Sequence, residues 1–132
     1  MVRALWKKFM DNVGGNQVSA LLGCKNGILM NVASVRDLVV AAAAEAVEVS
    51  KAEKTGLVDG DVSEFVERLK LLDLDGKTSM LQDIEAGRKT EADFLGGVVV
   101  ELSVMHHLRA PVNEMLVRCI HAKEDIAEFR KA

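Results

Sequence analysis

The sequence predicts an all-α protein of about six helices forming one domain, residues 1–132, and three observations support this. The 132 residues include one proline and no tyrosine, and aromatic residues make up only 4% of the chain. Alanine, valine, leucine and glutamate are abundant, which favours helices over a sheet sandwich. Apolar residues recur at helical spacing through most of the chain, and no segment has a convincing strand pattern. A chain of this length can bury a substantial core.

Three helices are expected in the first half of the chain. Gly23 would end the first, because glycine readily adopts the left-handed backbone found after helix ends. Lys25-Asn26-Gly27 predicts a turn. Ser34 would begin an alanine-rich second helix, and Asp61 would begin the third as a capping box with Glu64. The expected ranges are residues 5–22, 34–54 and 61–72.

Three more helices are expected in the second half. Ser79 and Gln82 match a capping box, so a short helix would begin at Ser79 and end at Gly87. Thr90 would begin a long apolar helix, and Pro111 suits the first turn of the last helix. The expected ranges are residues 79–87, 90–105 and 111–130.

Two adjacent glycines, Gly14 and Gly15, fall inside the first expected helix. Each costs about 1 kcal/mol of helix stability relative to alanine. A helix that keeps them usually needs something to approach its backbone closely. The partner would be either another helix or a ligand.

Composition and charge argue against several functional classes. The net charge of −3 gives no electrostatic signature of nucleic-acid binding, and the scattered basic residues do not suit an anionic membrane surface. The apolar run Val39–Ala44 is followed at once by Glu45, so it is too short to span a membrane. No signal peptide is visible, and we expect a cytoplasmic protein.

Cysteines and histidines give no sign of a metal site. Cys24 and Cys119 lie far apart in apolar surroundings, so two reduced thiols are expected rather than a disulfide. His106 and His107 are neighbours and point about 100° apart on a helix, so they cannot both face one metal. His121 has no partner at a zinc-binding spacing.

Lys8, Asn12 and Asn16 lie four residues apart in the first expected helix. Residues at this spacing share one side of a helix. Asparagine is a poor helix former, so two on one face call for an explanation. From spacing alone, a solvated polar stripe is a better explanation than a ligand-binding one.

Four sequence blocks occur in a fixed order and span almost the whole chain. They are Lys8-x-x-x-Asn12-x-x-x-Asn16, Ser79-Met80-x-Gln82-Asp83, Gly87-Arg88-x-Thr90-Glu91 and Pro111-x-Asn113-Glu114. Together they resemble the C-terminal half of the ketopantoate reductase (2-dehydropantoate 2-reductase) family. The resemblance implies a helical domain similar to the C-terminal domain of 6-phosphogluconate dehydrogenase.

The resemblance also implies roles for five residues. Lys8 matches the family's catalytic lysine, a general acid, and Glu91 matches a glutamate that bonds the substrate hydroxyl. Asn12, Asn16 and Ser79 match substrate-binding residues. Without the resemblance, Ser79 is explained as a helix cap and Glu91 as an acidic residue in a first helical turn.

The chain departs from the family pattern at three places. Ala92 stands where isoleucine is common, Gly96-Gly97 where Asn-Gly is common, and Gly76 where some members have a cofactor-contacting asparagine. These changes bear on cofactor grip and substrate identity more than on the fold. Arg88 is a weaker site candidate, and a surface salt bridge is its expected role.

The sequence contains no Gly-x-Gly-x-x-Gly loop, and seven residues precede Lys8. In the family, an N-terminal Rossmann domain binds NADP, so this chain alone is expected to bind no cofactor and to be inactive. The resemblance implies the substrate-binding and dimerisation domain of an enzyme of pantothenate and coenzyme A biosynthesis. Its partners would be a small 2-oxo acid, a Rossmann domain in cis or in trans, and a second copy of the chain. The alternative is a stand-alone, non-enzymatic helical binding or oligomerisation module derived from that family.

Overall fold

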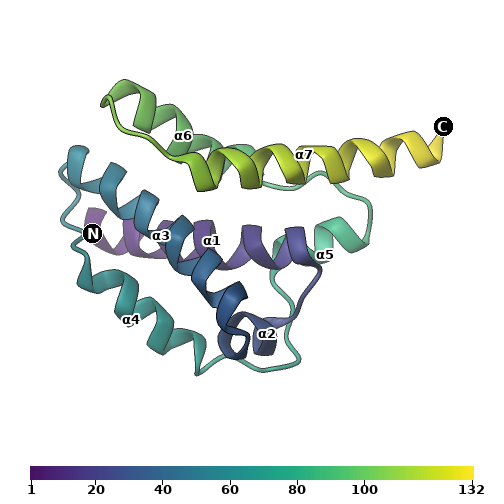
Figure 1. Cartoon of the computed structure of the whole chain (residues 1–132), viewed down its shortest axis with the longest axis horizontal. Helices are drawn as coiled ribbons and strands as arrows, with labels where there is room; N and C mark the ends of the chain where they lie inside the picture. The colour runs from purple at the N-terminus through teal and green to yellow at the C-terminus, as the bar shows by residue number, and fades with distance from the viewer.

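The computed structural model describes residues 1–132 and confirms the all-α prediction (Figure 1). Seven α-helices and one short 3-10 helix make up the molecule, with no strand. The elements are α1 Val2–Leu22, α2 Asn26–Asn31, α3 Ala33–Ala52, α4 Gly60–Leu69, α5 Ser79–Glu85, η1 Ala92–Phe94, α6 Gly96–Met105 and α7 Pro111–Lys131.

Helix α1 lies at the centre of the fold (Figure 1). It packs against α3, α5 and α7, while α6 lies beside α7 and α4 packs against α3. The core forms where these helices meet, and α1 contributes the fully buried Met10, Val13 and Val18. Because α1 contacts elements from both halves of the chain, it carries the predicted Lys8–Asn16 stripe on a well-fixed scaffold.

The close crossing of α1 and α3 explains the first of the two glycines. A Cβ atom on Gly14 would lie 2.9 Å from the Val39 carbonyl oxygen and 3.0 Å from a ring carbon of Phe65. Small buried residues of α3, among them Ala42 and Ala46, let the two helices approach. Helix packing is therefore the reason for glycine at position 14.

A buried polar network ties α6 and α7 to α1 and α3. The Gln17 side chain accepts a hydrogen bond from the Gly96 N–H at 3.0 Å and donates one to Asn113 Oδ1 at 3.0 Å. Asn113 Nδ2 in turn donates to Glu45 Oε1 at 2.8 Å. Glu45 also accepts the backbone N–H groups of Val112 and Asn113, which satisfies free donors at the start of α7. The Pro-x-Asn-Glu block thus has a structural role.

Several helix ends agree with the sequence. Gly23 ends α1 in the left-handed conformation, with φ of 66°, and Pro111 is the first residue of α7. The expected helix from Ser34 begins one residue earlier, at Ala33, and ends at Ala52.

The predicted turn at Lys25-Asn26-Gly27 was wrong, because α2 begins at Asn26. This helix buries Leu29 completely, and tertiary packing outweighs the local turn signal of Asn-Gly.

Two predicted helix caps were also wrong, although α5 begins at Ser79 as predicted. The helix cap before α5 is Thr78, whose Oγ1 accepts the Leu81 N–H, so Ser79 is the first helical residue and not the cap. Asp61 lies inside the first turn of α4, where it accepts the Val58 N–H and pairs with Arg3.

The helix expected from Thr90 is interrupted. The 3-10 turn η1 comes first, and α6 begins only at Gly96, where Gln17 accepts its backbone N–H. Helix α4 ends at Leu69, three residues before the predicted end.

Candidate functional site

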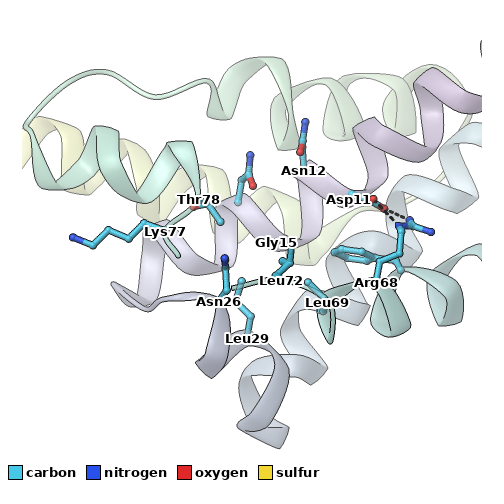
Figure 2. Close-up of a pocket in the computed structure, with 12 residues that line it drawn as sticks. Asp11, Asn12, Gly15, Asn26, Leu29, Arg68, Leu69, Leu72, Lys77 and Thr78 are labelled. Atoms are coloured by element: carbon cyan, nitrogen blue, oxygen red, sulfur yellow. Dashed lines mark hydrogen bonds and ion pairs between the residues drawn. The ribbon is translucent and has the colours of Figure 1, made fainter. Parts of the chain in front are cut away.

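A pocket of about 380 Å³ opens between α1, α2, α4 and the segment that precedes α5 (Figure 2). Asn12 and Asn16 of the polar stripe on α1 line this pocket, as a ligand-binding role for the stripe would require. The twelve lining residues are Asp11, Asn12, Gly15, Asn16, Asn26, Leu29, Phe65, Arg68, Leu69, Leu72, Lys77 and Thr78.

Asn12 and Asn16 differ from the other asparagines in having free side chains. The side chains of Asn26, Asn31 and Asn113 all donate hydrogen bonds within the chain. Those of Asn12 and Asn16 make none, although both lie in the middle of a helix, where asparagine is unfavourable. Two amides without partners at a pocket wall are available to donate to and accept from a small polar ligand.

Lys8 lies one turn earlier on α1, in a recess of about 290 Å³ that borders the pocket. The recess and the pocket share Asp11 and Arg68 as lining residues. Lys8 is exposed and forms no ion pair or side-chain hydrogen bond within the chain. Its ammonium is therefore free to interact with an anion at this end of the pocket.

Asp11 and Arg68 form a two-point ion pair between the recess and the pocket (Figure 2). The Arg68 guanidinium donates to the two carboxylate oxygens at 2.6 and 3.2 Å. Burial raises the pKa of Asp11, and the hydrogen bond and charge of Arg68 only partly oppose that rise. The pair leaves little net charge at this wall, so Asp11 does not repel an anionic ligand strongly.

Ser79 does not line the pocket, but its neighbour Thr78 does. The Ser19 hydroxyl donates to the Asn16 carbonyl at 3.0 Å and bonds the Thr78 hydroxyl as well. Since the Ser19 proton is used on Asn16, Thr78 is the donor in the second bond. This chain of bonds fixes the start of α5 beside Asn16, with Ser79 exposed and its hydroxyl unpaired.

Glu91 is exposed and lines neither the pocket nor the Lys8 recess. The residues on either side of Glu91 are held in place. The Thr90 N–H and hydroxyl donate to Glu124 Oε2 at 2.7 and 2.8 Å, and Ala92 is buried. Glu91 forms no ion pair with Lys8. The structure therefore groups Asn12, Asn16 and the Lys8 recess, and it leaves the roles of Ser79 and Glu91 as predictions.

Asn26 lines the pocket, and sequence reasoning missed it because its Asn-Gly context indicated a turn. Its Oδ1 is the one buried side-chain acceptor without a hydrogen-bond partner. A Cβ atom on Gly76 would lie only 2.8 Å from Asn26 Nδ2, so the absent side chain at position 76 leaves room for the Asn26 amide. Arg88 pairs with Asp83 at 3.0 Å on the surface, as expected.

No group of three or more histidine, cysteine, aspartate or glutamate side chains lies close enough together to hold a metal ion. None of the helices is long and apolar enough to cross a membrane.

Comparisons with known proteins identify the family and agree with the helical fold. The family model described as ketopantoate reductase PanE/ApbA C terminal matches residues 1–124. A 2-dehydropantoate 2-reductase of Pyrococcus horikoshii is 32% identical over 126 residues, which are 92% of this chain and 40% of that protein. The Halobacterium salinarum 2-dehydropantoate 2-reductase is 34% identical over 110 residues, 83% of this chain and 36% of that protein.

A solved structure of a dimeric ketopantoate reductase from Staphylococcus aureus has the same fold, with a TM-score of 0.86 at 22% identity. The match covers 95% of this chain and 44% of that one. The chain therefore spans less than half the length of the relatives that it matches.

Proposed function

This chain belongs to the ketopantoate reductase family as its helical C-terminal domain, and we propose that it supplies the substrate-binding and proton-donating groups of a 2-oxo acid reductase. The substrate would be 2-dehydropantoate or a related 2-oxo acid, and the product the 2-hydroxy acid. One observation carries the proposal: the only two asparagines with free side chains line a pocket that borders the Lys8 recess.

Reduction of a ketone adds a hydride to the carbonyl carbon and a proton to the carbonyl oxygen. Negative charge grows on that oxygen during the reaction, and a nearby ammonium stabilises it and donates the proton. Lys8 suits this role because no carboxylate of the chain pairs with it. The reaction atoms would lie at the border between the recess and the pocket.

Asn12 and Asn16 would hold the ketone and a substrate hydroxyl, because an amide both donates and accepts hydrogen bonds. We also propose that Ser79 contacts the substrate carboxylate and Glu91 the substrate hydroxyl, as their matches to the family blocks imply.

The cofactor would be NADP, held outside this chain. A nicotinamide dinucleotide is usually bound by a βαβ unit whose glycine-rich loop meets a helix N-terminus. The structure contains helices and no strand, so it has no βαβ unit. The residues of this chain therefore do not fit a nicotinamide dinucleotide. A Rossmann domain, in cis or in trans, would hold it.

Substitution of Lys8 tests the proposal in an active enzyme that contains this chain and a nicotinamide-binding domain. Lys8→Ala should lower kcat by roughly 10²–10⁴, the usual effect of losing a positioned general acid. Lys89→Ala is the matched control, because Lys89 is exposed and lies outside the pocket and the recess. An unchanged kcat for Lys8→Ala would show that Lys8 is not the acid.

A further inference from the structure

We infer that Arg68 is a positioning residue for Lys8, because it holds the carboxylate of Asp11 away from the Lys8 ammonium. The inference rests on the proposed function and adds a residue of α4 to the groups on α1. Asp11 follows Lys8 by three residues, and side chains at this spacing are neighbours on a helix surface. Both residues line the recess of about 290 Å³, yet Asp11 pairs with Arg68 and not with Lys8.

Arg68 occupies both oxygens of the Asp11 carboxylate (Figure 2). Its Nη2 donates to Oδ1 at 2.6 Å and its Nε to Oδ2 at 3.2 Å, the two-point geometry that the planar guanidinium group favours. The guanidinium also lies 6.0 Å from the centre of the Phe65 ring, within the range of a cation–π contact. Each oxygen of Asp11 is thus bonded to α4, and neither is bonded to Lys8.

The pair is one of three ion pairs that join α1 to α4 at intervals of about one helical turn. They are Arg3–Asp61 at 2.7 Å, Lys7–Glu64 at 3.3 Å and Arg68–Asp11 at 2.6 Å. Every acidic side chain of this ladder has a cation other than Lys8. Lys8 follows Lys7 by one residue, about 100° around α1, and its ammonium stays free for an anion from outside the chain.

Without Arg68, the Asp11 carboxylate would need another cation. Its side chain is 29% exposed, and burial raises the pKa of Asp11, so water stabilises its charge poorly. Lys7 is already held by Glu64, and Lys8 is the free cation in the same recess. A carboxylate paired with the Lys8 ammonium would turn it away from the ketone and hold its proton more firmly. Loss of Arg68 should therefore weaken Lys8 as a proton donor.

Chemical labelling tests this capture without relying on catalysis. Brief reaction of the substrate-free chain with acetic anhydride, followed by tandem mass spectrometry, gives the acetylation rate of Lys8 relative to the exposed Lys89. In Arg68→Met the rate at Lys8 should fall about threefold, because a paired ammonium loses its proton less readily. In the double variant Arg68→Met/Asp11→Asn the rate should return to its unsubstituted value. A slower rate at Lys7, with Lys8 unchanged, would overturn the inference.

Kinetics of the active enzyme test the consequence for the reaction. At saturating substrate, Arg68→Met should lower kcat about tenfold, and Arg68→Met/Asp11→Asn should recover to within about threefold of the unsubstituted enzyme. Arg68→Lys should lose less activity than Arg68→Met, because it keeps a cation beside Asp11. Arg3→Met is the matched control, since it breaks another pair of the ladder outside the recess and should leave kcat unchanged.

Circular dichroism would confirm that the variants are folded. A loss of kcat in Arg68→Met that persists in the double variant would show a purely structural role for Arg68 and overturn the inference, while the proposed function would stand. Failure of the proposed function is seen separately, as an unchanged kcat in Lys8→Ala.

Discussion

At the scale of single residues, the five asparagines show how one residue type serves different ends. Asn113 is fully buried, and its side chain forms hydrogen bonds with Gln17, Ala42 and Glu45. Asn12 and Asn16 have partly exposed side chains with no partner inside the chain. Asn113 therefore contributes to stability, whereas Asn12 and Asn16 are free to contribute to binding.

The change of an amide to a carboxylate should separate these two roles. Asn16→Asp should change the free energy of unfolding by less than about 0.5 kcal/mol, because it breaks no bond. The same variant should weaken binding of 2-dehydropantoate, because the acid is an anion. Asn113→Asp should cost more than about 2 kcal/mol, since it places a buried carboxylate against Glu45. Urea unfolding and calorimetric titration measure the two effects, and equal destabilisation by both variants would contradict the assignment.

Asp61 should make the stability of the protein depend on pH. Its side chain is 1% exposed, and burial alone would raise its pKa. The Val58 N–H and the Arg3 guanidinium together outweigh burial, so the pKa of Asp61 lies below its ordinary value. The ionised carboxylate therefore stabilises the folded protein above about pH 4, and this contribution is lost as the pH falls through the folded-state pKa.

Asp61→Asn should accordingly be less stable than the unsubstituted protein at pH 7, by about 1–3 kcal/mol. The difference should shrink as the pH falls below about 4, because the unfolded chain then takes up a proton at Asp61 before the folded protein does. Asp59→Asn is the control, because Asp59 is exposed and pairs with Lys51 at the surface. A difference that stays constant over this pH range in urea unfolding would contradict the role of the charge.

At the scale of helices, α6 shows why one helix start could not be predicted. Apolar periodicity extends back to Thr90, but the 3-10 turn η1 comes first and the helix begins only at Gly96. The Gln17 side chain fixes this start from α1, and a Cβ atom on Gly96 would lie 2.3 Å from Gln17 Oε1. The position of α6 is therefore set by a residue 79 positions away.

Gly96→Ala should destabilise the protein by about 1–3 kcal/mol, because α6 must move away from Gln17 and Val117. Gly97→Ala is the matched control. Its nearest neighbour would be 3.5 Å from the new Cβ atom, so alanine should be neutral or slightly stabilising in the helix. Urea unfolding of the two variants measures the difference, and equal stabilities would show that α6 is not fixed in this way.

At the scale of the whole molecule, the last third of the chain carries several of the exposed large apolar residues. The alanine-rich helix α3 buries Ala42, Ala43 and Ala46 in the core. Large apolar side chains are instead exposed on η1, α6 and α7, and the end of α7 extends past the other helices (Figure 1). They are Phe94, Val104, Met105, Met115, Ile126 and Phe129.

We expect the chain to form a twofold homodimer that covers part of this surface, because large exposed apolar patches usually mark association sites. Light scattering over a concentration series should give a mass near twice 14.3 kDa. Phe129→Glu should shift the mass toward the monomer, since Phe129 is 81% exposed on α7. Leu71→Glu, on a different surface, should not. A monomer mass at every concentration would contradict the expectation.

The sequence alone determined the helical class, most of the helix boundaries and the polar stripe on α1. These properties are local, because they depend on residues that are near one another in the sequence. Examples are the apolar periodicity, Gly23 at the end of α1 and Pro111 at the start of α7. The family blocks predict proton-donating and substrate-binding roles for Lys8, Asn12 and Asn16. Spacing alone favoured a solvated stripe, because it carries no information on what lies opposite.

Only the tertiary structure decided the features that depend on distant contacts. Residues 25–27 were expected to form a turn, but the burial of Leu29 stabilises helix α2 there. The Gln17 side chain sets the start of α6. The pocket exists because Phe65 and Leu72 lie across from Gly15, and no local pattern specifies that meeting. Side-chain burial and long-range hydrogen bonds outweigh local preferences of about 1 kcal/mol per residue, so these features required the folded chain.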